Sequence, residues 1–253
     1  MSRQKRFLLQ ESDLPKQWYN IQADMPHKPL PPLNPTTKQP VSVDDLAHIF
    51  CKACAQQELD TQNAWIDIPE EVQEKYKYYR ATPLVRAYAL EEALGTPAHI
   101  YFKNESVNPL GSHKVNSALP QCYYCKQEGV TNVTTETGAG QWGAALSYAA
   151  SVYGLSAAVY QVKISMQQKP YRSLVMRAFG AAVTGSPSMS TRAGKDIITR
   201  DPLHQGSLGT AISEAVELAT TTPNCKYTLG SVLNHVTPVS YTHLRAHETG
   251  SYL

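Results

Sequence analysis

The sequence lacks a long hydrophobic run near its N-terminus, where Phe7, Leu8 and Leu9 form the longest apolar stretch. Such a stretch is too short for a signal peptide or a membrane-spanning helix. A strong excess of one charge is also missing, because 23 Lys and Arg residues face 21 Asp and Glu residues, for a net charge of +2. This balance gives no reason to expect a nucleic-acid or membrane-surface partner. We therefore expect a cytoplasmic protein with neither kind of partner.

Cysteines are few, and four of the five form two C-x-x-C pairs, Cys51 with Cys54 and Cys122 with Cys125. Two such pairs are able to bind zinc. Both pairs, however, lie in helical patterns without flanking Gly/Pro turns, and about 70 residues separate them, outside the common zinc-ribbon spacings. We expect reduced thiols on helices, no disulfide framework and no metal site. A zinc- or thiol-binding module remains the alternative outside the enzymes.

The hydrophobic content of 42% and the length of 253 residues suit one large α/β domain or two smaller ones. Residues 1–43 are polar and carry six prolines between positions 26 and 40, which predicts an extended arm over a surface. Residues 44–57 show helical periodicity, and a helix start is expected near residue 70.

From residue 99 onward, strand and helix patterns alternate. Strands are expected at 99–103, 130–135, 156–163, 181–184 and from 227, and helices at 115–127, 141–153, 168–179, 190–198 and 211–220. Repeated βα units predict an α/β fold with a parallel sheet and helices on both of its faces. Ligands of such sheets bind at the carboxyl ends of the strands.

Two motifs follow neighbouring predicted strands in this pattern. Residues 108–116 read Asn-Pro-Leu-Gly-Ser-His-Lys-Val-Asn and place Lys114 between a turn and a helix. Residues 136–143 read Glu-Thr-Gly-Ala-Gly-Gln-Trp-Gly and place Glu136 at the end of an apolar strand, before a glycine loop. A lysine in a desolvated crevice is a good nucleophile toward an aldehyde cofactor, and a helix start behind a glycine loop binds anions. Together the motifs predict an amine-handling site.

Pro120 conflicts with a long helix after Lys114, since proline lacks an N–H group and clashes one turn back. The conflict is mild for a proline in the first turn. We therefore expect the helix to begin near Asn116 or Ser117.

The chain resembles the longer, second family of tryptophan synthase beta chains, which are fold-type II pyridoxal-phosphate enzymes. The resemblance runs from about residue 18 to about residue 236. It rests on Trp-Tyr-Asn at 18–20, the proline-rich arm, Arg-Ala-Thr-Pro-Leu at 80–84, Gly-Ser-His-Lys at 111–114, the glutamate loop at 136–143, Gln-Lys-Pro-Tyr-Arg at 168–172, Gly-Ser-Leu-Gly at 206–209 and Leu-Gly-Ser-Val-Leu-Asn-His at 229–235. The glutamate loop with Trp142 and the Lys-Pro-Tyr-Arg run are the most specific of these.

The resemblance implies roles for individual residues. Lys114 is expected to hold pyridoxal 5'-phosphate as a Schiff base and to move the proton at Cα of serine, with His113 by the cofactor phosphate and Asn116 nearby. Glu136 is expected to assist loss of the serine hydroxyl and to steer indole attack. The remaining assignments are Gly230 and Ser231 beside the cofactor ring, and a loop that receives the serine carboxylate, formed by Thr137, Gly138, Ala139, Gly140, Gln141 and Trp142.

The implied reaction is a β-replacement in which L-serine and indole give L-tryptophan and water, catalysed by a lyase of tryptophan biosynthesis. A homodimer and an alpha-type subunit are the implied protein partners. Residues 44–237 form the implied catalytic region, with about 132–230 as a mobile small domain. A serine or threonine dehydratase, or another fold-type II synthase, is the alternative within the same fold, although these usually carry a Ser/Asn-rich loop where Glu136 stands.

The chain departs from the family pattern at Ala81, at Pro120 and after about residue 238. The family's later phosphate loop and the residue that faces the pyridine nitrogen have no counterpart here. Residues 239–249 instead match one reading frame of a transposase-type sequencing adapter. We expect residues 238–253 to be an artefactual tail and residues 1–253 to be an N-terminal fragment that is inactive alone.

Overall fold

A four-stranded parallel sheet forms the centre of the computed structural model, which describes residues 4–245. Its strands are β6 (Asn132–Thr137), β7 (Ser156–Val162), β8 (Ala182–Ser186) and β9 (Cys225–Tyr227), in the order β8-β7-β6-β9. The chain runs outward from β6 to β8 and then returns to place β9 on the other side of β6. The strand order therefore reverses at β6, which is where parallel sheets bind ligands.

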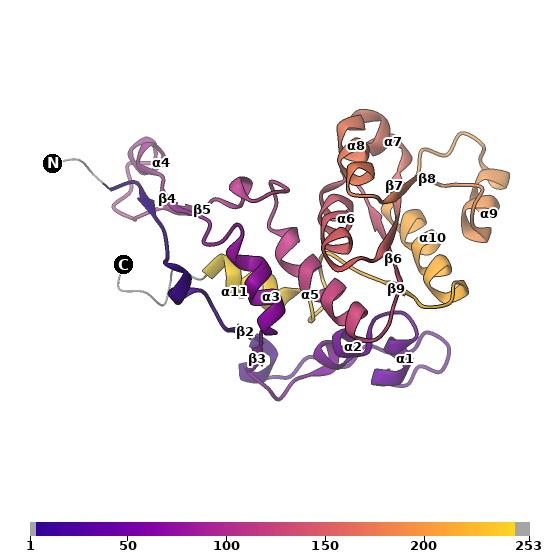
Figure 1. Ribbon diagram of the computed structural model, residues 1–253, viewed down its shortest axis with the longest axis horizontal. Helices are drawn as coiled ribbons and strands as arrows, with labels where there is room; N and C mark the ends of the chain where they lie inside the picture. Colours follow the sequence, from indigo (N-terminus) through magenta and orange to yellow (C-terminus); the bar gives the residue numbers. More distant parts are fainter. Residues whose placement is uncertain (1–3, 246–253) are drawn as a thin grey trace.

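Helices cover both faces of this sheet, as the alternating pattern predicted. Helices α6 (Gln141–Tyr153) and α8 (Pro170–Ala178) lie on one side, and α10 (Leu208–Thr221) lies on the other (Figure 1). Gly143 of α6 permits close packing, because a Cβ there would lie 2.6 Å from Met176 Sδ and 2.9 Å from side-chain atoms of Thr137 and Val159. Shorter helices α7 (Lys163–Gln168) and α9 (Arg192–Arg200) follow β7 and β8.

Helix α5 (Lys114–Gln127) begins earlier than expected, so Pro120 lies inside it and not in its first turn. A proline at this position leaves the carbonyl of Asn116, four residues earlier, without its helical donor. The structure supplies a substitute, because Tyr76 of α3 (Glu70–Lys77) donates its hydroxyl proton to Asn116 O at 2.6 Å. The tertiary contact thus allows a helix that the local sequence opposes.

Replacing Tyr76 with Phe is expected to leave the buried Asn116 carbonyl unpaired and to lower the free energy of unfolding by about 1–3 kcal/mol. The loss should be smaller in a Pro120→Ala background, because the substituted alanine regains the N–H group that pairs with this carbonyl. Denaturant unfolding of the four proteins of this cycle measures the difference. Tyr153→Phe is the control, since the buried Tyr153 hydroxyl has no partner among the described residues. Equal losses in the two backgrounds would contradict this explanation.

The expected strand at 99–103 exists as β5 (Tyr101–Lys103), but its place in the parallel sheet was predicted wrongly. It pairs antiparallel with β4 (Leu84–Arg86), which pairs antiparallel with β1 (Arg6–Phe7), in a separate sheet. Helix α4 (Tyr88–Ala93) lies in the connection between β4 and β5. The turn η3 (Glu105–Val107) leads from β5 toward α5.

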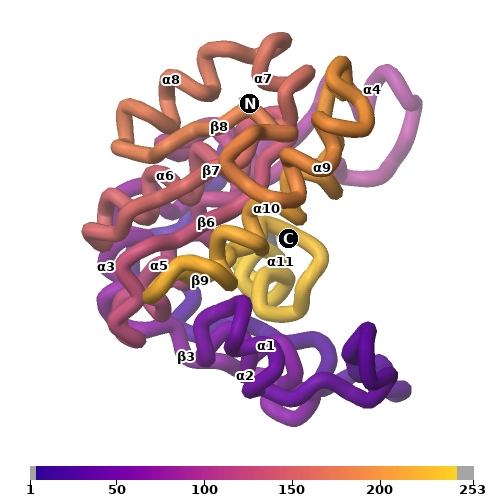
Figure 2. Tube along the Cα trace, turned by 90° about the vertical axis from the view of Figure 1, so that its right-hand side faces the viewer, coloured from indigo at the N-terminus to yellow at the C-terminus, as the bar shows by residue number. Residues whose placement is uncertain are grey.

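The N-terminal arm is mainly extended, with the short elements η1 (Glu11–Asp13), β2 (Gln17–Tyr19) and η2 (Ile21–Asp24). Strand β2 pairs antiparallel with β3 (Trp65–Asp67). Although the prolines at 26–40 are exposed, Trp18 is only 1% exposed and belongs to the core, so the arm does more than cover a surface. The helix expected at 44–57 is divided into α1 (Val43–Ala47) and α2 (Lys52–Leu59). These two helices and α7–α8 lie at opposite ends of the molecule (Figure 2).

Helix α11 (Thr237–Arg245) covers the first part of the segment that we expect to be an artefact; residues 246–253 lie outside the described part of the chain. His243 of α11 is buried, and its Nε2 accepts a hydrogen bond from Trp18 Nε1 at 3.3 Å. The origin of residues 238–253 stays a prediction that genomic sequencing beyond codon 238 tests. Among residues 4–245, no helix has the length and apolar character needed to cross a membrane.

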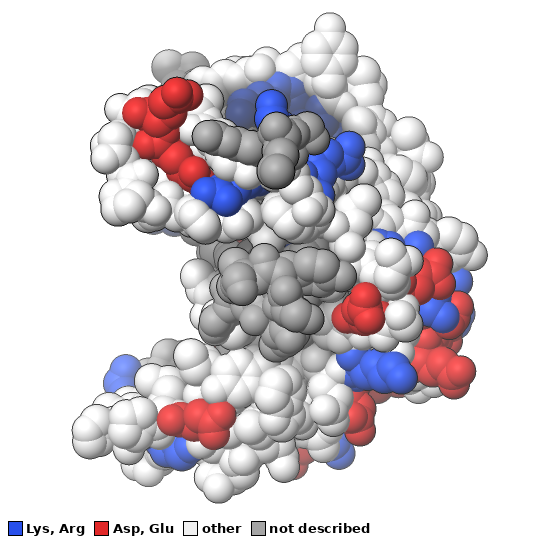
Figure 3. Space-filling model, turned by 90° about the vertical axis from the view of Figure 1, so that its left-hand side faces the viewer, with Lys and Arg blue, Asp and Glu red and all other residues white. Residues whose placement is uncertain are grey.

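Acidic and basic side chains form small separate groups on the face shown in Figure 3. This distribution is consistent with the near balance of positive and negative residues in the sequence.

Candidate active site

A cavity of about 150 Å³ opens at the carboxyl ends of β6 and β9, where the strand order reverses. Three segments that are distant in sequence meet there: the start of α5, the loop after β6 and the loop after β9. The lining residues are Lys114, Glu136, Thr137, Gly138, Ala139, Gln141, Trp142, Leu208, Gly230 and Ser231. The fold thus brings together most of the residues that the two motifs and the family resemblance singled out, and it adds Leu208 at the start of α10.

Two larger hollows lie elsewhere. One of about 520 Å³ is lined by residues that include His48, Glu128 and Lys226. Another of about 420 Å³ is lined by residues that include Glu11 and Arg80. Neither contains any residue that the sequence singled out for chemistry, so size alone does not identify the site.

Lys114 is the first residue of α5, and its side chain is half-buried. Its Nζ donates a hydrogen bond to the carbonyl oxygen of Gly230 at 2.8 Å, across the cavity from one loop to another. Burial lowers the pKa of the Lys114 amine, while the charge of Glu136 opposes this effect. An amine with a lowered pKa loses its proton more easily and becomes a better nucleophile.

The turn before Lys114 is held by Asn108, which acts as a side-chain clamp. Its Oδ1 accepts from the N–H groups of Leu110 at 3.0 Å and Ser112 at 3.2 Å, and its Nδ2 donates to Ser112 O at 2.8 Å. These three bonds fix the backbone two residues before Lys114.

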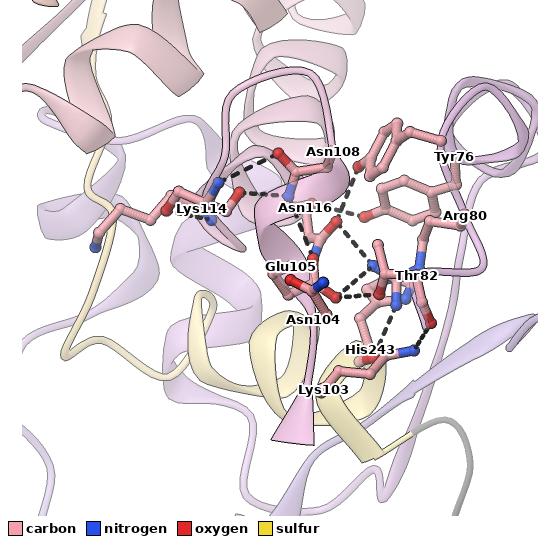
Figure 4. Close-up of polar contacts among 12 residues, drawn as sticks. Tyr76, Arg80, Thr82, Lys103, Asn104, Glu105, Asn108, Lys114, Asn116 and His243 are labelled. Atoms are coloured by element: carbon pink, nitrogen blue, oxygen red, sulfur yellow. Dashed lines mark hydrogen bonds and ion pairs between the residues drawn. The ribbon is translucent and has the colours of Figure 1, made fainter. Parts of the chain in front are cut away.

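Glu105 links Asn108 to helix α5 through hydrogen bonds. Its Oε2 accepts from Asn108 Nδ2 at 3.3 Å and from Asn116 Nδ2 at 3.4 Å, while Thr82 Oγ1 donates to Oε1 at 2.6 Å. One buried carboxylate therefore contacts residues on both sides of Lys114. Figure 4 shows the Lys114 side chain pointing away from this polar network, so the network supports the backbone and leaves the amine free for the cavity.

Glu136 lies near the end of β6 and is only 5% exposed. The Tyr227 hydroxyl donates a hydrogen bond to its Oε2. Burial raises the pKa of the Glu136 carboxyl, and the hydrogen bond from Tyr227 opposes that rise. A buried carboxyl group beside an amine, with a raised pKa, is suited to transfer protons.

The loop after β6 leaves backbone donors available. Gly140 has φ of 93°, a conformation that favours glycine, and a Cβ there would lie 2.6 Å from Arg172 Cβ. The N–H groups of Ala139 and Gly140 donate to no acceptor within residues 4–245. They precede the N-terminus of α6, so this loop provides a site for a carboxylate.

The loop after β9 is fixed on both sides. The Gln121 amide of α5 accepts from Leu229 N–H at 3.1 Å and donates to Leu229 O at 2.9 Å, as a paired strand would. A Cβ on Gly230 would lie within 2.4–2.6 Å of the Trp142 ring. Trp142 is itself oriented by a bond from its Nε1 to Thr135 Oγ1 at 2.7 Å. Glycine is therefore needed at position 230 to let this ring close the cavity.

His113 and Asn116, expected near a phosphate, are not among the residues that line the cavity. His113 is half-buried, and its pKa is lowered by burial and by the charge of Lys114. Asn116 is fully buried, and its Oδ1 accepts from Tyr79 Oη at 2.9 Å and from Arg80 Nη1 at 3.1 Å. Their contacts with a phosphate stay predictions.

The four cysteines of the C-x-x-C pairs lie together between α2 and α5, buried and without disulfides. Hydrogen bonds from the Cys125 and Cys54 thiols lower the pKa of Cys51. Within the described residues, no group of three His, Cys, Asp or Glu side chains is arranged to hold a metal ion.

We therefore expect purified protein to retain no stoichiometric zinc after exposure to the metal and desalting, as measured by mass spectrometry of the metal content. Cys51→Ser should leave that content unchanged. About one zinc per chain, lost in Cys51→Ser and in Cys125→Ser, would instead support the zinc-binding alternative.

Comparison with protein families matches residues 76–237 to the family described as "Pyridoxal-phosphate dependent enzyme". The chain is 54% identical over 228 residues to a protein named "Tryptophan synthase beta chain 2" from Thermotoga maritima, a match covering 90% of this chain and 54% of that protein. It is 51% identical over 232 residues to a protein of the same name from Aquifex aeolicus, a match covering 92% of this chain and 53% of that protein. The chain thus spans about half the length of the curated relatives it matches.

Solved structures share the fold at low sequence identity. A pyridoxal 5'-phosphate-dependent aspartate racemase superposes with a TM-score of 0.52 at 21% identity, covering 73% of this chain and 51% of the other. An L-serine ammonia-lyase from Rhizomucor miehei superposes with a TM-score of 0.51 at 20% identity, and the match covers 67% of this chain and 46% of the other. These similarities support a common fold and do not distinguish between reactions.

Proposed function

Because the chain belongs to the family of pyridoxal-phosphate dependent enzymes, we propose that it is part of a tryptophan synthase beta chain, which joins L-serine and indole into L-tryptophan and water. The observation that carries the proposal is the meeting of Lys114, Glu136 and the 137–142 loop at one cavity. The names of the relatives that are 54% and 51% identical support the same reaction.

The described residues fit the reactive end of pyridoxal phosphate. Lys114 offers a half-buried amine for its aldehyde, and Gly230 and Ser231 form the adjacent wall. A side chain at position 230 would collide with Trp142. Glycine at this position therefore keeps the wall flat where it would face the cofactor ring. His113 and Asn116 are the residues proposed for the phosphate side.

When bound, pyridoxal phosphate supplies an electron sink for the bonds at Cα of an amino acid. We assign the proton transfers to the protein: Lys114 removes the proton at Cα of serine and later returns it to Cα of the product, and Glu136 delivers a proton to the departing serine hydroxyl. Glu136 then accepts the proton that indole loses as its carbon attacks. The N–H groups of residues 138–142 bind the serine carboxylate, and Trp142 helps to exclude water.

Incubation of the protein encoded by the complete genomic reading frame with cofactor, serine and indole tests this proposal, with residues 1–253 assayed in parallel. We expect tryptophan formation that depends on indole. A serine dehydratase would release pyruvate from serine at the same rate without indole, and it would form no tryptophan. That second result would reject the proposed reaction while leaving the family assignment intact.

We further propose that the whole protein is a cytoplasmic homodimer and binds an alpha-type subunit. Residues 132–230, proposed as the mobile small domain, contain the whole four-stranded parallel sheet. The near balance of charge is the argument against a nucleic-acid partner.

A further inference from the structure

Tyr227 is the principal hydrogen-bond donor to the candidate proton-transfer group. Strand β9 pairs with β6 so that Tyr227 lies beside Thr134, two residues before Glu136 and on the same face of the strand. Both side chains are buried, Tyr227 at 4% exposure and Glu136 at 5%. The Tyr227 hydroxyl donates a hydrogen bond to Glu136 Oε2. Thr135 Oγ1 also donates to this oxygen, but at the longer distance of 3.4 Å.

The position of the Tyr227 ring is set from outside the cavity. Its backbone N–H donates to Ile49 O at 2.9 Å, and its ring lies 5.6 Å from the Phe50 ring. Phe50 in turn packs against His235, with ring centroids 5.3 Å apart, and His235 Nδ1 contacts Glu58 at 2.9 Å. The phenol is therefore held in place by the segment between α1 and α2 and not by the groups that line the cavity.

This arrangement sets the direction of the Glu136 carboxyl group and opposes the effect of burial on its protonation. Burial raises the pKa of Tyr227, so the phenol stays protonated and acts as a donor toward Glu136. A donor directed at Oε2 favours the ionised carboxylate. The bonds from Tyr227 and Thr135 both go to Oε2, so Oε1 accepts no side-chain hydrogen bond from another described residue, and Glu136 lines the cavity.

We propose that Tyr227 is a positioning residue, which orients Glu136 with Oε1 toward the substrate and opposes the effect of burial, so that the carboxyl group is able both to give and to take a proton. This inference rests on the proposed function, since the hydrogen bond matters for the reaction only if Glu136 moves protons. Without the phenol, burial alone would favour the protonated and freely rotating carboxyl group.

The test is a titration of the Glu136 carboxyl carbon by ¹³C NMR in cofactor-free protein, in the parent and in Tyr227→Phe. Phe keeps the ring that packs on Phe50 and removes only the donor. We expect the pKa of Glu136 to rise by about 1, because a hydrogen bond to a charged group stabilises it strongly. In the active protein, the acidic limb of the kcat/KM profile for indole, the substrate from which Glu136 accepts a proton, should move upward by a similar amount.

Two further proteins separate this role from a general structural effect. Tyr153→Phe removes an equally buried hydroxyl that has no described partner, and it should leave the Glu136 titration unchanged. Replacement of Tyr227 by 3-fluorotyrosine keeps the ring and makes the phenol a stronger donor, so it should lower the pKa of Glu136. This second replacement decides the question if Tyr227→Phe folds poorly.

An unchanged Glu136 titration in Tyr227→Phe, or an equal rise in Tyr153→Phe, would overturn the inference. The titration needs neither serine nor indole, so its outcome is independent of the proposed reaction. A shifted titration in a protein that makes no tryptophan rejects the reaction alone. Tryptophan formation with an unshifted titration rejects the role of Tyr227 alone.

Discussion

Lys114→Ala is expected to abolish covalent attachment of pyridoxal phosphate and with it all detectable turnover. The Lys114 amine lies at the cavity, donates to the carbonyl of Gly230 and has a lowered pKa because it is half-buried. Borohydride reduction followed by peptide mass spectrometry measures the attachment in the protein encoded by the complete genomic reading frame. The parent should carry the reduced cofactor on the peptide that contains Lys114, and the variant should carry none.

Lys103 provides a demanding control, because burial lowers its pKa to about 7, so it is also a candidate nucleophile. Its Nζ donates to the carbonyl of Thr82, however, and it lies within the network around Arg80, outside the residues that line the cavity. Lys103→Ala should therefore keep the cofactor attached to Lys114. Cofactor trapped on Lys103 in the Lys114→Ala variant would show that the assignment is wrong.

Glu136→Ala is expected to keep cofactor and serine binding but to lower the rate of tryptophan formation by about 10²–10⁴-fold, the usual contribution of a general acid–base group. Among the described residues that line the cavity, Glu136 is the only one with a carboxylate, and burial raises its pKa toward the range where it can both give and take a proton. Steady-state rates with serine and indole, together with separate binding titrations, distinguish lost chemistry from lost binding.

Glu128→Ala is the matched control, since Glu128 also has a carboxyl pKa raised by burial but accepts a backbone hydrogen bond from Ala53 far from the cavity. Its rate should stay close to that of the parent. A Glu136→Ala rate within about threefold of the parent would make Glu136 a bystander, because a general acid–base group typically contributes about 10²–10⁴-fold.

Sequence reasoning predicted the βα alternation because each unit is encoded locally. The helices at 141–153 and 211–220 and the strand at 156–163 were found within a few residues, as was the presence of helices on both sheet faces. The strand at 99–103 was assigned to the wrong sheet, because partner choice depends on β4 and β1 and not on the strand itself. The start of α5 was missed because Tyr76, 44 residues before Pro120, supplies the compensating hydrogen bond.

The location of the candidate site was predicted from the sequence, but most of the contacts that support it were not. Lys114, Glu136 and the glycine loop were recognisable because lysine, carboxylate and glycine have distinctive uses at strand ends. Tyr227, Gln121 and Glu105 were not identified, since a buried Tyr, Gln or Glu has no local signature and acquires its role only through partners on other elements. The contact of Asn116 with a phosphate stays a prediction, and its amide oxygen accepts hydrogen bonds from Tyr79 and Arg80.

The contact between Gly140 and Arg172 offers a way to observe the site from outside. Because a Cβ at position 140 would lie 2.6 Å from Arg172 Cβ, the glycine loop and α8 are in close contact at this point, and we expect a shift of the loop to move α8. Tyr171, the adjacent residue of α8, is 79% exposed. An environment-sensitive fluorophore at position 171 would therefore report rearrangement of the loop as an optical signal, with no label inside the cavity.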